Sequence, residues 1–510
     1  MSAIAGIYRL DSRPVSRSQI AATMDALAHR GPDGRCVWLD GNVALGSLFL
    51  QTRAEAPASH PVANAATQCV FVGDVRVDNR VDLQRELGSS SIENDNELLL
   101  RAFERWGNAC VEHVVGDFAF VIWDGVTRSL HCFRDPMGVK PFYYFRSDRV
   151  FAFASEIQAL LALPDVPNTL DDVRVAQSLM NEQDDRERPF YWAIKRLPAA
   201  HRMSVTPTRV QQSTYWHLDP ERELHLRDDR EYADAFRSIF TAAVTARIRT
   251  PYPVAATLSG GLDSSAVVSV ARSAIARSGP PLQTFSLVFP DLPADDRRII
   301  DERHYVDAVT SRGGVKSRLV RGDQISPLSD LERMLRHAEE PFNAPNLYLH
   351  WAMFAAASQV GCRIFLDGFD GDSAVSHGLS RLEEMVDRGE WSGFEAEVRA
   401  FARNRSMDSR SVLDHFGLPQ LRNFAATGKP LHWLRGAREL TRRFDVSWRN
   451  LLFHHGAMPV VAKLRAGFRA NPAAGLAESL LHPRLAANAA AHRRQDSVAQ
   501  TERGSNIAGI

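Results

Sequence analysis

The sequence predicts an α+β sandwich followed by an α/β domain with a parallel sheet, and three observations support this prediction. In residues 1–218, short apolar segments of strand length follow one another in runs, with only a few helical segments between them. From residue 226 onward, apolar strands alternate with helices, which is typical of a parallel sheet with crossovers. The composition, 45% hydrophobic and 24% charged, is that of a folded globular protein.

The first region, residues 1–218, is expected to contain many strands and few helices. Strands are expected at Ala3–Leu10, Val43–Leu50, Cys69–Val75, Gly116–Trp123, Ser129–Arg134, Pro141–Phe145, Val150–Ala154, His201–Val205 and Gln211–Trp216. Helical spacing of apolar residues predicts helices at Val15–Leu27, Asp95–Trp106 and Glu156–Leu163.

The second region, residues 226–510, begins with an amphipathic helix at Asp229–Arg249. Parallel strands are expected at Val254–Leu258, Leu282–Phe289, Lys316–Val320 and Arg363–Leu366. Helices are expected at Ser264–Ser278 and Glu302–Arg312, and a long helical stretch precedes the last strand. After Leu379 the chain is expected to be mostly helical.

Charge and cysteine content exclude several classes of protein. Sixty-one basic residues balance sixty-one acidic ones, so no overall positive field recruits nucleic acid or an anionic membrane. The five cysteines are widely spaced and form no C-x-x-C pair, which favours reduced thiols in a cytosolic protein. The N-terminus lacks a signal-peptide pattern, and no apolar segment is long enough to span a bilayer. We therefore expect a cytoplasmic protein without nucleic-acid or membrane partners.

The segment Ser259–Ser265 carries the sharpest chemical signal, Ser-Gly-Gly-Leu-Asp-Ser-Ser, between an expected strand and an expected helix. Two glycines let the backbone approach a ligand closely. The helix N-terminus offers N–H groups and a positive dipole end, and the serine hydroxyls add donors. Asp263 supplies a carboxylate for magnesium. The pattern indicates a pyrophosphate cradle; the alternative is a serine-rich helix cap. A Walker-type loop is absent, because Gly428-Lys429 is followed by Pro430.

A second carboxylate cluster, Asp367-Gly368-Phe369-Asp370-Gly371-Asp372, follows the last expected strand. Ligands of open α/β sheets gather at the carboxyl ends of strands, so we expect this cluster near the first motif. Asp263 and one of these aspartates would then hold magnesium on nucleotide phosphates. The alternative is a calcium-binding or solvated turn. His377 is interpreted as a loop histidine rather than a proton carrier.

On these residues the chain resembles the glutamine-dependent asparagine synthetase superfamily over essentially its whole length. The N-terminal matches are His29–Gly34, Gly116–Phe120, Arg134-Asp135 with Gly138 and Pro141, and Ala154–Glu156. The C-terminal match is the S-G-G-x-D-S loop at Ser259–Ser264. The resemblance implies a class II amidotransferase-like αββα sandwich, followed by a synthetase domain of the pyrophosphate-loop ATPase type with a helical C-terminal part.

Departures from the family pattern imply that the glutaminase site is degenerate. Ser2 occupies the position of the catalytic N-terminal cysteine, and Ser47 aligns with the arginine that holds the glutamine carboxylate. Asp74-Val75-Arg76 replaces the Asn-Gly-Glu that frames the substrate, and only the acid Asp95 remains. Serine serves as an N-terminal nucleophile in other hydrolases, so Ser2 alone does not exclude glutaminase activity. Because the residues that bind glutamine are lost as well, we expect no glutaminase activity. We expect the first domain to be structural.

In the second domain, Phe369 aligns with the glutamate of asparagine synthetase and the tyrosine base of β-lactam synthetase. Phenylalanine cannot move a proton, which weakens both assignments. The clusters Asp367–Asp372 and Ser376–Gly378, with Glu340–Asn346, are similar to the branch of lasso-peptide macrolactam cyclases. That branch adenylates an Asp or Glu side chain of a precursor peptide, and the peptide's own amine attacks it. Its expected partners are the precursor peptide, a leader-binding protein and a leader peptidase.

The resemblance implies an ATP- and magnesium-dependent, AMP-forming ligase that joins a carboxylate to an amine. Asp263 and Asp372 would hold magnesium, and Asp370 and Glu340 are candidate proton acceptors. The expected ATP-binding residues are Leu258, Ser259, Gly260, Gly261, Asp263, Ser264, Ser265, Leu287, Asp367 and Gly368, with the two leucines beside adenine. The alternatives are a glutamine-hydrolysing asparagine synthetase and an inactive ATP-binding scaffold.

The C-terminal part departs from the family as well. Family members continue through a proline–aromatic–aspartate segment and a basic residue near the reacting phosphate, and neither is found after Asn488. We expect either a truncated chain with slow turnover on its own or a site that is closed in another way.

Overall fold

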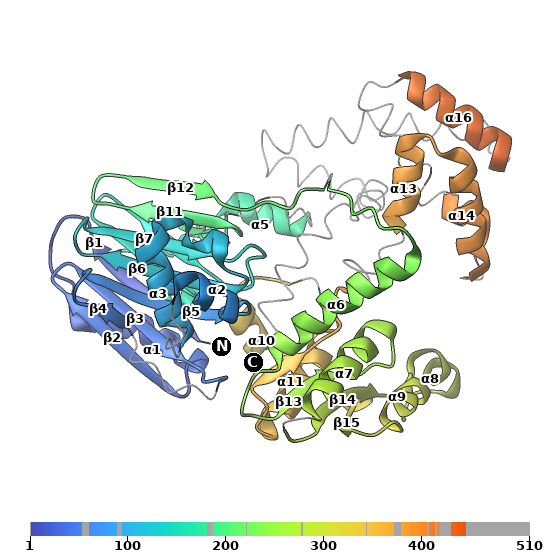
Figure 1. Cartoon of the computed structure of the whole chain (residues 1–510), viewed down its shortest axis with the longest axis horizontal. Coiled ribbons are helices and arrows are strands. Elements are labelled where there is room, and N and C mark those ends of the chain that lie inside the picture. The colour runs from blue at the N-terminus through green and yellow to red at the C-terminus, as the bar shows by residue number, and fades with distance from the viewer. Residues whose placement is uncertain are drawn as a thin grey trace. The chain divides into compact units, whose positions relative to one another are not determined.

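A computed structural model describes residues 2–53, 61–88, 94–180, 185, 187–220, 222–276, 279–342, 344–371, 379–404, 407–413, 417 and 430–444 (Figure 1). Their contacts divide them into a larger unit that runs to Phe369 and a smaller helical unit that begins at Asp370. The larger unit contains both the N-terminal sandwich and the parallel sheet.

The sandwich consists of two antiparallel sheets, each of six strands among the described residues. The first sheet has the order β10-β8-β9-β1-β3-β2, with β1 Ala3–Arg9, β2 Gly34–Asp40, β3 Val43–Phe49, β8 Tyr143–Arg146, β9 Val150–Ala154 and β10 Ile194–Arg196. The second has the order β12-β11-β7-β6-β5-β4, with β4 Val62–Asn64, β5 Cys69–Val77, β6 Gly116–Asp124, β7 Ser129–Arg134, β11 His201–Val205 and β12 Val210–Thr214.

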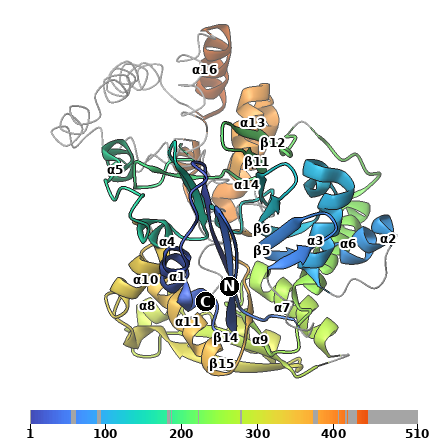
Figure 2. The ribbon, with the colours of Figure 1, turned by 90° about the vertical axis from the view of Figure 1, so that its left-hand side faces the viewer.

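Helices cover the outer faces of both sheets, which makes the αββα layering visible when the sandwich is seen edge-on in Figure 2. Helices α1 (Arg17–Ala26) and α4 (Ile157–Leu161) pack on the first sheet. Helices α2 (Arg80–Leu87) and α3 (Asp95–Trp106) pack on the second. A central core between the sheets is filled by side chains from both, which accounts for the near-continuous burial of β1, β6 and β9.

Short elements complete the sandwich. They are the 3₁₀ turns η1 (Ala28–Arg30) and η2 (Gly107–His113) and the helix α5 (Asp172–Leu179). The cap of α1 shows how local sequence fixes a boundary: Ser16 accepts a hydrogen bond from the backbone N–H of Gln19, and the Gln19 side chain accepts one from the Ser16 backbone. This reciprocal pair satisfies two N–H groups that a helix start leaves unpaired.

The second fold element is a parallel sheet in the order β15-β14-β13-β16. Its strands are β13 Val254–Thr257, β14 Leu282–Val288, β15 Val315–Arg321 and β16 Ile364–Leu366. Helices α6 (Asp229–Arg247), α7 (Leu262–Ile275) and α9 (Arg303–Thr310) contribute to the core on one face. Helix α11 (Leu347–Gln359) packs on the other. The remaining segments are α8 (Ala294–Ile300), η3 (Gly322–Gln324) and α10 (Leu331–Ala338).

Within the larger unit, side chains tie the parallel sheet and its helices to the sandwich. Arg247, at the end of α6, pairs with Asp117 on β6. Arg363, before β16, pairs with Asp33 and lies over the ring of Tyr252. Glu339 accepts hydrogen bonds at 2.8 Å from the backbone N–H groups of Ile157 and Gln158, at the start of α4. These contacts join residues up to 330 positions apart in sequence.

The smaller unit contains α13 (Leu379–Arg388), α14 (Trp391–Asn404) and α16 (Pro430–Phe444). Their apolar faces meet in a core that includes Leu382, Phe394 and Leu440. Arg443 of α16 pairs with Glu395 of α14 at 2.7 Å. This unit confirms the expectation of a mostly helical chain after Leu379 within the described residues.

The expected fold class is confirmed, and the differences concern marginal elements. Strand β2 was not expected, because it lies at a sheet edge and only alternate residues are shielded from solvent. Helix α2 was not expected either, since Leu83 is its one buried residue. Strand β8 begins two residues after the expected Pro141, because proline cannot donate a ladder hydrogen bond.

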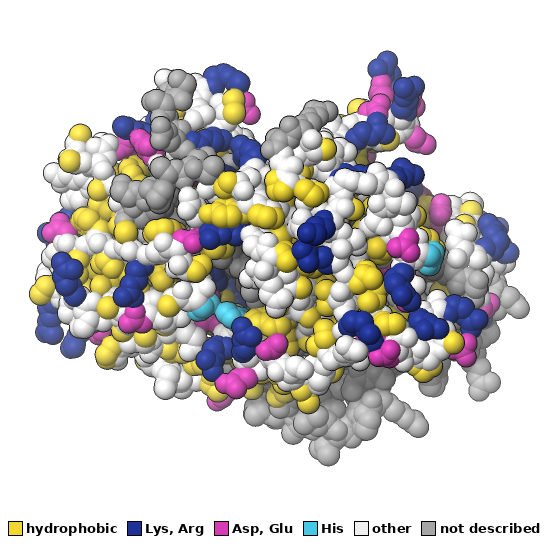
Figure 3. Space-filling view, turned by 90° about the horizontal axis from the view of Figure 1, so that it is seen from below, with side chains coloured by type: hydrophobic (Ala, Val, Ile, Leu, Met, Phe, Trp, Pro, Cys, Tyr) yellow, Lys and Arg dark blue, Asp and Glu magenta, His cyan; other side chains and the backbone are white. Residues whose placement is uncertain are grey.

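The state of the cysteines and the distribution of surface charge agree with what the composition predicts. All five cysteines are free. Lys and Arg side chains are interspersed with Asp and Glu over the face seen in Figure 3, in line with the equal numbers of both signs. No helix in the described part of the chain combines the length and apolar character that crossing a bilayer requires.

Candidate active site

The Ser259–Ser265 segment forms the loop that follows β13 and the first turn of α7. Gly260 has a φ of +92°, a conformation that side chains with a Cβ rarely adopt. A Cβ at this position would lie 2.5 Å from the Cβ of Tyr305 on α9. Both constraints require glycine at residue 260, so the shape of the loop is built into the sequence.

The start of α7 carries the donors that a phosphate needs. Gly261 is the N-cap residue and supplies no side-chain hydrogen bond to the helix. The backbone N–H of Ser259 donates to the Ser264 hydroxyl at 3.2 Å, and the two hydroxyl oxygens lie 3.0 Å apart. The buried Ser265 hydroxyl has no hydrogen-bond partner among the described residues. The uncapped helix start and this orphaned hydroxyl fit phosphate oxygens.

The two sequence motifs lie side by side at the carboxyl edge of the parallel sheet. Asp367 and Gly368 follow β16 directly. A Cβ on Gly368 would lie 2.6 Å from the backbone nitrogen of Ser264 and 2.9 Å from the carbonyl carbon of Asp263. The Asp367-Gly368 turn therefore packs on the first turn of α7, and only glycine permits this approach.

The Asp367 carboxylate lies next to a backbone N–H group and a histidine ring. Its Oδ1 accepts a hydrogen bond from the Phe369 backbone N–H at 3.1 Å, and its Oδ2 lies 3.9 Å from the Nδ1 of His350. Burial raises the pKa of the Asp367 carboxyl above its usual value, and the nearby His350 offsets part of that rise. Phe369 itself is 58% exposed.

The fit to magnesium is carried by Asp263. This residue lies in the first turn of α7, is partly exposed and has no ion-pair partner among the described residues. No group of three or more His, Cys, Asp or Glu in the described ranges could hold a metal on its own. One carboxylate fits a magnesium ion whose other ligands are phosphate oxygens and water. Asp372, the second expected ligand, and His377 lie outside the described residues.

Four other expected site residues have different surroundings. Leu258 is fully buried in the core beneath α7, whereas Leu287 packs in the cluster on the α11 face, so their side chains lie on opposite faces of the sheet. Glu340 pairs with Arg196 of the sandwich at 3.1 Å, and its contacts are not with the Ser259–Ser265 loop. Asp370 has a φ of +63° and begins the smaller unit.

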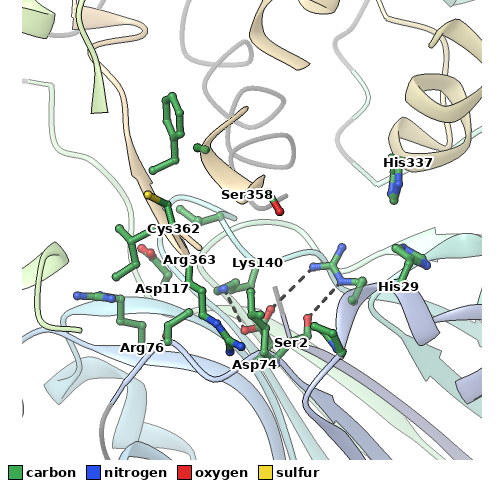
Figure 4. Close-up of a pocket in the computed structure, with 18 of the residues that line it drawn as sticks. Ser2, His29, Asp74, Arg76, Asp117, Lys140, His337, Ser358, Cys362 and Arg363 are labelled. Atoms are coloured by element: carbon green, nitrogen blue, oxygen red, sulfur yellow. Dashed lines mark hydrogen bonds and ion pairs between the residues drawn. The ribbon is translucent and has the colours of Figure 1, made fainter. Parts of the chain in front are cut away.

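Ser2, which is expected to mark a degenerate glutaminase site, lines a cavity of about 710 Å³ in the larger unit (Figure 4). Ser2, Asp74 and Arg76 line it from the sandwich, and Ser358 and Cys362 line it from α11 and the turn before β16. The Ser2 hydroxyl accepts a hydrogen bond from the Leu50 backbone N–H at 3.2 Å, and its carbonyl accepts one from Arg30.

Charged side chains in this cavity are paired with one another. Asp74 lies 2.9 Å from the Nζ of Lys140 and 3.9 Å from Arg30. Glu156 accepts hydrogen bonds from Arg30 at 2.9 Å and pairs with His29 at 3.0 Å. Burial alone would raise the pKa of Glu156, but His29 and Arg30 outweigh it and hold the pKa below its usual value.

The other residues expected at a degenerate glutaminase site are either paired or buried. Asp95 accepts a hydrogen bond from the Val77 backbone N–H at 2.8 Å and pairs with Arg80 and Arg53. The buried Arg76 contacts Asp78, and burial lowers its pKa to about 10. Ser47 is buried on β3 and Val75 packs toward the core under α3, so neither presents a cation for a substrate carboxylate.

Sequence reasoning missed His350, Lys140 and Glu339. His350 lies on an apolar helix, and no local signal links it to Asp367. Lys140 falls within the family-like segment around Gly138, but its pairing with Asp74 joins a loop to strand β5, which is distant in sequence. Glu339 stands beside the expected Glu340, and only the tertiary structure distinguishes their roles.

Comparisons with known proteins support the same two-part organisation. A family model described as a glutamine amidotransferase domain matches residues 1–216, and one described as asparagine synthase matches residues 235–496. The chain is 30% identical over 305 residues to the glutamine-hydrolyzing asparagine synthetase 3 of Bacillus subtilis, covering 57% of this chain and 48% of the relative.

Two further relatives show how names vary among similar proteins. A putative glutamine-hydrolyzing asparagine synthetase of Methanocaldococcus jannaschii is 28% identical, covering 57% of this chain and 60% of that protein. The amidase chry2 of Gibberella zeae is 26% identical, covering 69% of this chain and 54% of that protein. The chain spans about half the length of the curated relatives it matches.

Proposed function

Because the chain belongs to the asparagine synthase family, we propose that it is an ATP-dependent ligase that activates a carboxylate as an acyl-adenylate and joins it to an amine. The observation that carries this proposal is the Ser259–Ser265 loop, with Gly260 at a φ of +92° and the uncapped start of α7 behind it. The Asp367-Gly368 turn packs on the same helix start.

The proposed first step uses ATP as a substrate. A carboxylate oxygen attacks the α-phosphorus, the bond from that phosphorus to the bridging oxygen breaks, and pyrophosphate leaves with the electron pair. Ser264, Ser265 and the N–H groups of α7 bind the departing pyrophosphate, where negative charge accumulates. Magnesium, held by Asp263 and the phosphates, would supply further neutralisation.

The nitrogen source is proposed to be an amine other than glutamine nitrogen. Asp74 and Asp95 are engaged in ion pairs, and Ser47 and Val75 offer no cation to a glutamine carboxylate. An Asp95 carboxylate that already pairs with two arginines has little remaining charge to offer an ammonium group. These contacts support a structural role for the sandwich, both in the fold and in the interface with the parallel sheet.

The finer proposal is that carboxylate and amine belong to one precursor peptide, so that the product is a lasso-type macrolactam. An intramolecular amine requires no ammonia, and this would permit the loss of the glutamine site. In that case a leader-binding protein and a leader peptidase are the proposed partners. The names of the relatives favour the alternative, a glutamine-hydrolysing asparagine synthetase.

Product analysis separates these proposals. The purified chain is incubated with ATP and magnesium, and with either L-aspartate and ammonium or a synthetic peptide that has a free N-terminal amine and an acidic side chain. AMP and pyrophosphate are expected, with loss of one water from the peptide if it is the substrate. Asparagine formed from aspartate would favour the alternative, and ADP in place of AMP would overturn the proposed function.

A further inference from the structure

A histidine lies beside the Asp367 carboxylate, at the carboxyl edge of the parallel sheet. His350 lies in the first turn of α11, and its Nδ1 is 3.9 Å from the Oδ2 of Asp367. The two side chains are 21% and 22% exposed, so both are partly shielded yet reachable from solvent. The ring of His350 also meets the ring of Phe369 edge-on, with centroids 5.8 Å apart.

This pair is close to the phosphate-binding loop. Asp367 directly precedes Gly368, whose Cα lies against the backbone of Asp263 and Ser264. Thr257, at the end of β13, lies beside the Asp367 carboxyl as well. The imidazole therefore lies at the same carboxyl edge of the parallel sheet as the phosphate-binding loop.

His350 contacts one acidic and two aromatic side chains. These are the Asp367 carboxylate and the rings of Phe354 and Phe369. Asp367 is the charged group that these contacts bring to the imidazole, and a carboxylate beside one ring nitrogen orients the ring. A solvent-reachable histidine beside a carboxylate is a candidate general base.

Resting on the proposed function, we propose that His350 accepts the proton of the attacking amine in the amide-forming step, with Asp367 positioning the imidazole. The amine nitrogen attacks the carbonyl carbon of the acyl-adenylate, and a C–N bond forms. The C–O bond to AMP breaks, and AMP leaves with the electron pair. The proton released from nitrogen passes to the imidazole and then to solvent.

The experiment separates activation of the carboxylate from capture by the amine. Wild type and His350→Gln are assayed for carboxylate-dependent exchange of labelled pyrophosphate into ATP, with L-aspartate and the acidic peptide as probes. Amide formation is measured in parallel, with ammonium or the peptide amine as nucleophile. Hydroxylamine, which is mostly unprotonated near neutral pH, replaces the amine in a third assay.

In the His350→Gln variant, amide formation is expected to fall about 100-fold, the range for losing a general base. Pyrophosphate exchange should stay within about twofold of wild type, and hydroxylamine should still trap the acyl group, because it needs little help to lose a proton. The control is His113→Gln. That histidine also pairs with a carboxylate, Glu86, at 2.9 Å, but lies in the sandwich. It should leave all three assays unchanged.

Each result has a defined meaning. Equal loss of exchange and amide formation in His350→Gln would assign the histidine a structural role and overturn the inference. Unchanged amide formation would overturn it as well. If wild type catalyses no carboxylate-dependent exchange with either probe, the proposed function itself is wrong.

Discussion

Gly260 illustrates how one residue fixes the geometry of the phosphate loop. Its φ of +92° and the Tyr305 Cβ, 2.5 Å from where a Cβ would be built, each exclude a side chain. Gly313 also has a positive φ, +72°, but a Cβ there would meet nothing within 4 Å. A comparison of the two positions therefore separates the cost of a left-handed backbone, which both share, from the cost of steric overlap, which arises at Gly260.

Gly260→Ala is expected to lower the free energy of unfolding more than Gly313→Ala. In both variants the left-handed alanine lowers the free energy of unfolding by about 1 kcal/mol. Steric overlap at residue 260 lowers it by about 1–3 kcal/mol more. The difference is measured by urea unfolding of both variants. Equal losses in the two variants would show that the α9 contact with the loop is not tight.

The chemical role of Asp263 can be tested by removing the negative charge of its side chain. Asp263→Asn should cut pyrophosphate release by about 100-fold or more, as when a strong transition-state contact is removed. Asp295→Asn is the matched control, because that aspartate also lies in a first helical turn but pairs with Arg298 at the surface. An unchanged rate in Asp263→Asn would refute the magnesium role.

At the residue scale, the sequence predicted the loop but not its neighbours. The glycines and serines of Ser259–Ser265 are contiguous, so their chemistry is visible in one dimension. Tyr305 and His350 reach the same edge of the sheet from α9 and α11, and only tertiary packing brings them there.

A side chain at the C-terminal end of α10 accepts hydrogen bonds from the N-terminal end of α4. Glu339, the C-cap of α10 at a φ of +57°, places its carboxyl on the N-terminus of α4. Burial, with the charge of Glu156, raises the pKa of Glu339 to about 8, even though the two backbone N–H groups lower it. The cap is thus a buried titratable contact between the parallel-sheet region and the sandwich.

This cap predicts a pH dependence of stability. Between its usual pKa of 4.5 and about 8, Glu339 is ionised in the unfolded chain but keeps its proton in the folded one. Its contribution to stability is therefore full below pH 4.5 and is lost as pH rises toward 8. Glu339→Gln should flatten this part of the profile in urea unfolding, whereas Glu332→Gln, at an exposed glutamate on α10, should not. Parallel profiles for wild type and Glu339→Gln would contradict the raised pKa.

Element prediction succeeded where burial patterns were strong. Helix α3 has the expected bounds, Asp95–Trp106, because its apolar residues recur with helical spacing and Asn94 caps it. Strand β13 was found because its sequence is apolar and its residues are mostly buried. Strand β2 and helix α2 escaped because few of their residues are buried, and β2 pairs on one side only, with the neighbouring strand β3.

At the scale of the whole molecule, side-chain contacts join the amidotransferase-like sandwich to the rest of the larger unit. Arg247, Arg363 and Glu339 connect it to the parallel sheet and its helices, and Asp74 and Lys140 form an ion pair in the cavity beside Ser2. Burial would raise the pKa of Asp117, but pairing with Arg247 holds it below its usual value. The family relationship was predictable from contiguous motifs, whereas this network was not, because its members lie in separate segments.

Glutamine should be neither hydrolysed nor required by this molecule. Purified protein incubated with glutamine is expected to release no glutamate above the level of Ser2→Ala, because the groups that would bind glutamine are engaged or missing. Glutamate release that disappears in Ser2→Ala would show that the serine is an active nucleophile and that the asparagine synthetase alternative applies.

The central claim is that the carboxylate is activated by adenylation at the Ser259–Ser265 loop. The most direct test uses a carboxylate substrate labelled with ¹⁸O and follows the label by mass spectrometry during amide formation. Because the carboxylate oxygen attacks the α-phosphorus and the C–O bond later breaks, one ¹⁸O atom should appear in AMP. Label in inorganic phosphate, or amide formation with no transfer of label to AMP, would contradict the account.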